Sequence, residues 1–272
     1  MNRNILFLAI GLLFCSVTYG QSFKKDFWTA LQAKNMIKAE EVLNAWDFAD
    51  ANDPELYVSY FNYYTVKSLE KDSTVLDKQY TSKALEFISE GIERFPTRFD
   101  MRLAKIYMFE RLKDFTSFTD EVIKLVNYSK KIEHNWKGEN FSLINEAEEV
   151  FYGSVMEFQE KLFSEENPSL YKNIIQISNE MVKNYPNHVQ SWLNISTINF
   201  MQKEYDKSLE ALMKAINIEP KNAMLLFNIA HVYGLKGDKE NTKKYYELSV
   251  ANATDKEEKL KEAAQKQLDA IK

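Results

Sequence analysis

The sequence has few of the residues on which tight turns and thiol chemistry depend. Its 272 residues include 7 glycines, 5 prolines and 1 cysteine. Glycine and proline supply the backbone conformations of most tight turns, so their scarcity disfavours a chain with many turns. Few segments show the period-two alternation of a half-buried strand, and no regular alternation of strands and helices is visible. With 14% aromatic residues and abundant Leu, Ala, Lys and Glu, the composition predicts an all-α protein.

The motifs of common enzyme classes are missing as well. The sequence contains no G-x-S-x-G, no P-loop and no dinucleotide-binding glycine pattern. Its three histidines, His134, His188 and His231, are far apart, and none lies in an H-E-x-x-H motif. The acidic cluster at residues 146–149 could flank a glycosidic bond, but on an amphipathic helix such clusters are far more often solvated. We therefore expect a protein that is not an enzyme, with no catalytic residue, no metal and no cofactor.

The charge balance excludes two further classes of partner. The chain has 35 basic and 40 acidic side chains, a formal net charge of −5. An acidic protein is repelled by the phosphates of nucleic acids and by anionic lipid headgroups. We expect no nucleic acid partner and no electrostatic binding to a membrane surface.

Residues 1–20 resemble a secretory signal peptide. A basic start precedes the apolar run Ile5–Phe14, and small residues lead to a cleavage site before Gln21. The apolar run is too short to span a membrane comfortably. A lipid anchor on Cys15 is the alternative, although bulky Phe14 departs from the lipoprotein motif. The sequence predicts export to the periplasm or out of the cell, and a mature chain with no thiol and no stable membrane span.

The clearest pattern in the chain is the 34-residue stretch Val189–Asn222, which is followed by a copy of itself, Ala223–Asp255. In the first copy, apolar residues recur at helical spacing on either side of a short polar break. Pro220 ends the second helix because proline has no N–H to continue it. The residues that carry the spacing are Trp192, Ile195, Ser196, Tyr205, Ser208, Leu212, Ala215 and Pro220, then Leu226, Ile229, Ala230, Tyr233, Gly237, Asp238 and Tyr246.

This spacing resembles that of the tetratricopeptide repeat (TPR), a pair of antiparallel helices. Each pair leaves one apolar face uncovered, so the resemblance implies a stack of pairs with a cap at its end. Weaker similarity covers Asn167–Pro220 and Pro54–Tyr107, and another type of helical hairpin is an alternative for the N-terminal half. The predicted fold class is an all-α TPR-like superhelix, an α-solenoid of antiparallel helix pairs with a C-terminal capping helix. Thr254 and Glu257 form a capping box at the start of this last helix.

The domain organisation follows from these similarities. We predict a signal peptide at 1–20, divergent TPR-like repeats at 21–131, an irregular joint at 132–140, clear repeats at 141–255 and the capping helix at 256–272. The helix that starts at Pro54 is rich in aromatic residues, with Tyr57, Tyr60 and Phe61 among them. At this spacing, packing between helices is favoured over a platform for a carbohydrate or peptide.

The resemblance also implies a binding surface, because the first helix of each TPR lines a concave groove. Carried over to this sequence, the partner-binding positions that the resemblance implies are Gln190, Leu193, Asn194, Thr197, Met201, Phe227, Asn228 and His231. A clamp for a carboxylate would need Lys or another polar residue where Leu193 and Phe227 stand, so a chaperone-type clamp is not supported. Asn194 and Asn228 are equally compatible with a structural role.

A basic stripe is the second candidate surface. Arg98, Arg102 and Lys105 lie at i, i+4 and i+7 on one face of a predicted helix. Such a stripe could bind an acidic segment or a chain-terminal carboxylate through charge-assisted hydrogen bonds. The alternative, which we favour, is a solvated face paired with acidic neighbours such as Glu93, Asp100 or Glu110.

Three functions compete at this point. The first is a non-enzymatic scaffold or adaptor of the cell envelope that binds a protein or peptide segment in the groove. The second is an architectural subunit of an envelope assembly that uses its convex face. The third, a glycan-active helical-repeat protein, would need convergent carboxylates and glycine-rich loops, neither of which the sequence shows.

Overall fold

The computed structural model describes residues 22–69 and 76–271, and in these residues the protein is all-α. Within them, the β-type pairing consists of isolated bridges at Lys137. The predicted all-α fold class is therefore confirmed. The predicted signal peptide, with Cys15, lies outside the described residues.

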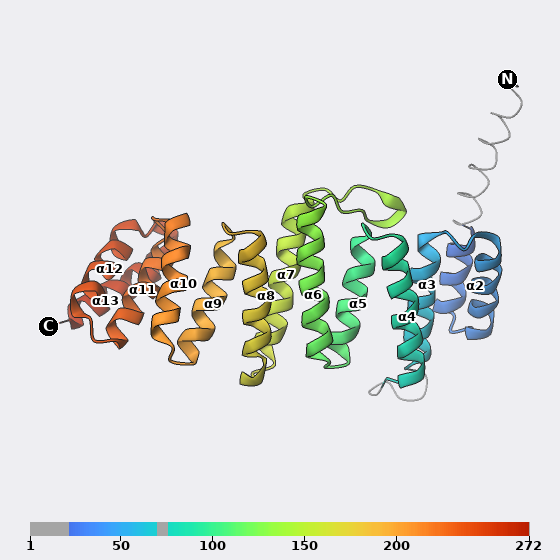
Figure 1. The fold of residues 1–272 in the computed structure, drawn as a ribbon, viewed down its shortest axis with the longest axis horizontal. Helices are drawn as coiled ribbons and strands as arrows, with labels where there is room; N and C mark the ends of the chain where they lie inside the picture. Colours follow the sequence, from blue (N-terminus) through green and yellow to red (C-terminus); the bar gives the residue numbers. More distant parts are fainter. Residues whose placement is uncertain (1–21, 70–75, 272) are drawn as a thin grey trace, which may run out of the picture. The chain divides into compact units, whose positions relative to one another are not determined.

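The described helices are short and closely spaced along the chain. A first helix spans residues 22–32. It is followed by α2 (Met36–Asp50), α3 (Pro54–Lys67), α4 (Lys78–Arg94), α5 (Phe99–Arg111), α6 (Phe115–Lys131), η1 (Glu139–Phe141), α7 (Ala147–Ser164), η2 (Pro168–Leu170), α8 (Tyr171–Asn184), α9 (Val189–Met201), α10 (Tyr205–Ile218), α11 (Ala223–Leu235), α12 (Lys239–Asn252), η3 (Asp255–Glu257) and α13 (Glu258–Ala270) (Figure 1).

The chain forms two compact units, which we describe separately. The N-terminal unit ends at Glu121 and also includes Lys131–Phe151, and the C-terminal unit consists of Val122–Lys130 and the residues from Tyr152 onward. The segment at 132–140, which was predicted to be a joint, belongs to the N-terminal unit. Helices α6 and α7 are each divided between the two units.

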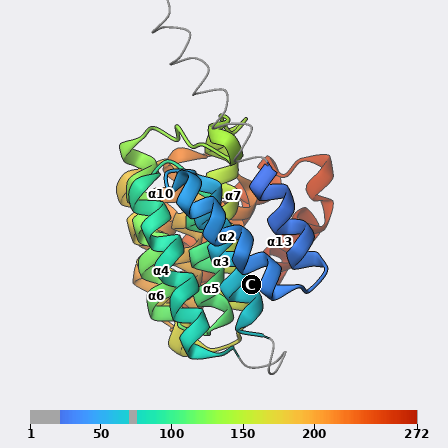
Figure 2. The same cartoon turned by 90° about the vertical axis from the view of Figure 1, so that its right-hand side faces the viewer.

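In the N-terminal unit, the aromatic residues of α3 serve packing between helices, as the sequence analysis favoured. Tyr57, Tyr60 and Phe61 are buried. The ring of Tyr60 stacks on that of Phe87 from α4, with 4.1 Å between the centroids. Helix α4 comes so close to α3 that Gly91 lies against Tyr57. Helix α2 packs against α3 as well (Figure 2).

The C-terminal unit is a stack of helix pairs, α9 with α10 and α11 with α12, preceded by α8. Small residues permit the close approach within the first pair, because the hydroxyl oxygens of Ser196 and Ser208 lie 2.7 Å apart and both side chains are buried. Ala215, a third small residue of this helix pair, is fully buried as well.

The predicted capping helix is α13, and it packs on the last repeat. Ala264 is fully buried in a cluster with Tyr246 of α12, and Leu268 packs against the same cluster. The helix begins with the predicted capping box, in which the Thr254 N–H donates to the Glu257 carboxylate over 3.0 Å. This part of the predicted fold is confirmed.

Candidate functional site

A small pocket lies between the two clear repeats. Its volume is about 120 Å³. It is lined by residues of α9, α10 and α11, namely Leu193, Ser196, Thr197, Phe200, Ser208, Leu212, Asn228, His231 and Val232. Four of the predicted groove residues, Leu193, Thr197, Asn228 and His231, therefore come together at one place.

The two helices that carry these four residues contain no Asp, Glu, Lys or Arg. This holds for all of Val189–Met201 and Ala223–Leu235, in a chain of which 28% is charged. Thr197 and His231 are exposed at the pocket, while Leu193 and Asn228 are partly buried. The pocket thus offers an apolar wall together with hydroxyl, amide and imidazole groups. These are the groups that contact an uncharged peptide segment, with an apolar side chain inserted and a backbone to hydrogen-bond.

The inner end of the pocket is fixed by packing. The hydroxyls of Ser196 and Ser208 bond to each other, so they need no partner from outside. The ring of Phe200 lies 5.5 Å from that of His231, which connects α9 to α11. The exposed side chains of the pocket are Thr197 and His231.

The other predicted groove residues on these helices lie elsewhere. Gln190 donates a hydrogen bond to the Asn194 side chain over 3.0 Å, and Asn194 is buried. Met201 is half exposed at the end of α9. Phe227 packs edge-on against Tyr246, 5.3 Å away, within the cluster that α13 covers. None of these four residues lines the pocket.

Arg98 is not a surface residue, and this corrects the predicted basic stripe. Its guanidinium is fully buried and donates to Glu55 over 2.6 Å and to Asp100 over 2.7 Å. Burial opposes the charged form, but the hydrogen bonds to Asp100 and the charge of Glu55 raise the pKa of Arg98 above its ordinary value. Lys24 binds the other oxygen of Glu55 over 2.7 Å. The sequence analysis missed Glu55 because it lies 43 residues before Arg98.

The rest of the stripe is also paired within the N-terminal unit. The guanidinium of Arg102 lies 5.7 Å from the ring of Trp136 and donates to the Pro96 carbonyl over 3.2 Å. Lys105 forms an ion pair with Glu121 over 3.1 Å. The favoured alternative named Asp100 among the acidic partners, and Asp100 does pair with Arg98. It also expected a solvated face, which is wrong for Arg98 because that side chain is buried.

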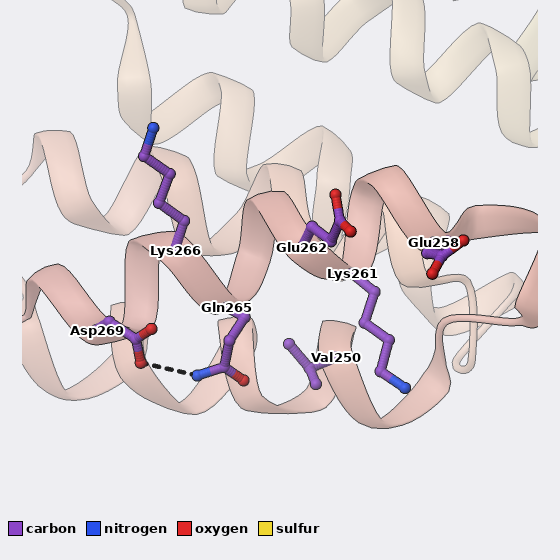
Figure 3. Close-up of a pocket in the computed structure, with 7 residues that line it drawn as sticks. All are labelled: Val250, Glu258, Lys261, Glu262, Gln265, Lys266 and Asp269. Carbon is purple, nitrogen blue, oxygen red and sulfur yellow. Dashed lines mark hydrogen bonds between the residues drawn. The ribbon is translucent and has the colours of Figure 1, made fainter.

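A larger hollow on α13 has a different character (Figure 3). It is lined by Val250, Glu258, Lys261, Glu262, Gln265, Lys266 and Asp269. Basic and acidic side chains alternate along the exposed side of the helix, and Gln265 donates to Asp269 over 2.9 Å. The charged groups do not converge on one point, as is typical of a solvated helix face.

The part of the chain that the structure describes contains neither a candidate metal site nor a membrane-spanning helix. Within residues 22–69 and 76–271, no group of three His, Cys, Asp or Glu side chains is placed to hold a metal ion. In the same part of the chain, no helix has the length and apolar character needed to cross a membrane.

Stacked helix pairs joined by short turns define the class of the protein as an α-helical repeat protein. The family model described as tetratricopeptide repeat matches residues 189–222 and 225–255. These are the two stretches that the sequence analysis singled out. Residues 189–255 therefore contain two tetratricopeptide repeats, and the predicted resemblance is confirmed there.

Solved TPR structures are similar to the chain only at a distance. YrrB, described as a TPR protein with an unusual peptide-binding site, is 12% identical with a TM-score of 0.43, over 82% of this chain and 97% of its own. MamA is 14% identical with a TM-score of 0.37, over 64% and 90%. The TPR2AB domain of yeast Sti1, in complex with pHSP90, is 12% identical with a TM-score of 0.36, over 92% and 96%. No protein of curated function matches the sequence. At these TM-scores, no function is transferred from the solved structures.

Proposed function

We propose that the protein is a non-enzymatic interaction scaffold that binds an uncharged, apolar peptide segment of a partner protein in the groove of its C-terminal repeats. The observation that carries this proposal is the pocket between α9 and α11, where Leu193, Thr197, Asn228 and His231 meet. One apolar side chain of the partner inserts beside Leu193. The amide of Asn228 and the hydroxyl of Thr197 bond to the partner's backbone.

The absence of charge on α9 and α11 supports this chemistry over a carboxylate clamp. A charged group buried against an uncharged wall loses its hydration without gaining an ion pair. A segment with an apolar anchor has no such cost and gains from the burial of its apolar surface. The preferred partner segment therefore has a medium-sized apolar side chain flanked by uncharged residues.

The test places a photo-crosslinking amino acid at Thr197, which is exposed at the pocket, or at Lys214, which is exposed on α10 and does not line it. We expect the same partner protein to be crosslinked repeatedly from position 197 and not from position 214. The crosslinked peptide, identified by mass spectrometry, should be apolar and uncharged. Crosslinks that form only from position 214 would instead favour an architectural role through another face.

A matched pair of substitutions tests whether the pocket binds the partner, by separating a charge placed in the pocket from the same charge placed elsewhere. Thr197→Arg places a charge in the uncharged pocket, whereas Asn217→Arg places the same charge on an exposed position of α10 outside it. Arginine favours helix more than either original residue, so both variants should keep their helicity. We expect capture of the partner to fall at least about tenfold, or about 1.4 kcal/mol, for Thr197→Arg only. An equal loss in both variants would contradict the groove assignment.

We also propose that the protein acts in the cell envelope after export. The support is the signal-peptide pattern of residues 1–20, with its apolar run and the cleavage position before Gln21. Fractionation of expressing cells, followed by N-terminal sequencing of the exported form, tests this. We expect a chain that begins at Gln21. A full-length chain retained in the cytosol would contradict the proposal.

A further inference from the structure

The segment between α6 and α7 forms a strap, residues 132–146, that reaches back along the ends of α5 and α4 within the N-terminal unit (Figure 1). Its backbone joins the α4–α5 turn as an added strand would. The Phe99 N–H donates to the Lys137 carbonyl over 3.0 Å, and the Lys137 N–H donates to the Thr97 carbonyl over 2.9 Å. These two hydrogen bonds form one isolated parallel bridge between the strap and the turn.

The base of the strap is anchored firmly. Trp136 is fully buried, and its ring lies 5.1 Å from that of Phe99. The ring also stands 5.7 Å from the guanidinium of Arg102. A fully buried indole with such neighbours holds the base in place.

The tip of the strap, residues 138–143, is held much more lightly. The Glu139 carboxylate forms an ion pair with Lys24 over 2.5 Å, and its side chain is 61% exposed. Phe141 is 45% exposed, with its ring 5.8 Å from that of Phe95 and 5.9 Å from the guanidinium of Arg98. Exposed ion pairs contribute little to stability. The tip is thus docked by one carboxylate and one aromatic ring, both partly in water.

The backbone of the tip is strained. Asn140 and Phe141 have φ of 53° and 54°, in the left-handed region that residues other than glycine seldom adopt. Further along the strap, Glu133, His134 and Glu146 share this feature. Such conformations persist only where surrounding contacts hold them, and they cluster at switches and ligand clamps. A half-exposed phenylalanine in this conformation favours release of the tip.

We propose that the tip is an internal ligand, and that the site it covers binds a segment of another protein that pairs a carboxylate with an aromatic side chain. In this exchange the tip lifts while Trp136 stays buried. Lys24 then binds the incoming carboxylate in place of Glu139, and the incoming ring takes the place of Phe141 on Phe95 and Arg98. The occupant differs from the uncharged segment proposed for the C-terminal groove, so the two proposals stand or fall separately.

The tip competes with a free peptide segment for the same site, and its covalent link to the rest of the strap gives it an advantage. A tip joined to its site by a few residues has a high effective concentration, so a free segment displaces it only at high concentration or with better contacts. Removing the side chains of the tip removes the competitor. Binding of a free segment should then become measurable.

The probe is the tip itself as a free peptide, acetyl-Gly-Glu-Asn-Phe-Ser-Leu-amide, with a fluorine label on its phenylalanine. Its 19F signal is followed as the full chain is added, either native or with Glu139→Ser and Phe141→Ser, which leave Trp136 in place. We expect the stripped chain to bind the peptide roughly tenfold or more tightly than the native chain does. Adding Lys24→Ala, or replacing Glu by Gln in the peptide, should weaken this binding.

Two results with the stripped chain would overturn the proposal. One is a stripped chain with native circular dichroism that does not bind the peptide at millimolar concentration. The other is equal binding by the native and stripped chains, which would show that the tip does not occupy the site.

If the stripped chain does not fold, a measurement on the native chain tests whether the tip lifts. Hydrogen exchange compares the Gly138 amide, which bonds to the Ser142 carbonyl over 2.8 Å, with the Lys137 amide, which bonds to Thr97. Once Glu139 and Phe141 leave their contacts, the strained turn that closes the Gly138–Ser142 bond relaxes. Lifting of the tip therefore predicts much lower protection at Gly138, through a local opening that denaturant hardly affects. Exchange of both amides only through global unfolding would refute the lifting tip.

Discussion

The buried guanidinium of Arg98 provides the sharpest test of how the N-terminal unit is held together. Arg98 is fully buried, and its guanidinium forms ion pairs with the carboxylates of Glu55 and Asp100. Lys24 forms a second ion pair with the Glu55 carboxylate. Replacing Arg98 by Met keeps most of the side-chain volume but removes the charge. The Glu55 carboxylate, itself buried, then loses its shortest contact.

The magnitude follows from what remains around Glu55. Removing one partner of a buried ion pair costs about 3–5 kcal/mol, because the other charge stays buried without compensation. Here Lys24 still binds Glu55, and Asp100 is 41% exposed, so water hydrates part of what Arg98 leaves. We therefore expect Arg98→Met to lower the free energy of unfolding by about 2–4 kcal/mol.

The assay uses the distribution of tryptophans. Trp28, Trp46 and Trp136 lie in the N-terminal unit and Trp192 in the C-terminal unit, and the chain has 4 in all. In a Trp192→Phe background, fluorescence during urea unfolding reports the N-terminal unit alone. The urea midpoints and slopes with and without Arg98→Met give the change in the free energy of unfolding of that unit.

A second substitution separates lost charge pairing from lost packing. Adding Glu55→Met to Arg98→Met removes the stranded carboxylate, and the double variant should recover part of the lost stability. The reasoning is refuted if Arg98→Met costs less than about 1 kcal/mol, or if the two substitutions are simply additive.

Three further outcomes follow from local packing and burial. Gly91→Ala should destabilise by about 1–3 kcal/mol, since a Cβ there would lie 2.8 Å from the Tyr57 Cβ, and thermal unfolding measures this. Gly153→Ala is the matched control: its Cβ would meet nothing within 4 Å, so alanine should stabilise α7 by about 0.5–1 kcal/mol. Burial lowers the pKa of His188 below its ordinary 6.5, so the fold favours the neutral ring and should lose stability as pH falls below 6.5. Urea unfolding at neutral and mildly acidic pH should show a smaller loss in His188→Gln, and an unchanged loss would contradict this assignment.

Local and periodic signals made most of the fold predictable from the sequence. The 34-residue interval, Pro220 and the small residues Ser196 and Ser208 all act within one helix pair, where spacing along the chain translates directly into contact. The capping box of Thr254 and Glu257 is equally local. The same register predicted four residues of the pocket, because equivalent positions on successive first helices face the same side.

The roles of individual charged residues could not be predicted in this way. Arg98 and Arg102 have the spacing of an exposed stripe, yet Arg98 is fully buried and Arg102 lies against Trp136. Their partners come from helices and loops tens of residues away. Phe227 likewise does not line the pocket, because its ring packs against Tyr246 in the cluster that α13 covers. Periodicity identifies a face of a helix but not the segment that covers it.

The sequence by itself thus determined the repeat architecture, the capping helix and the uncharged character of α9 and α11, because these depend on residue types at fixed short intervals. Only the tertiary structure decided that Glu55 and Asp100 neutralise Arg98 and that the strap lies on the N-terminal unit. Contacts between distant parts of the chain have no constant spacing. They depend on how helices and loops of particular lengths pack, and the strap, which breaks the repeat period, is where that dependence is greatest.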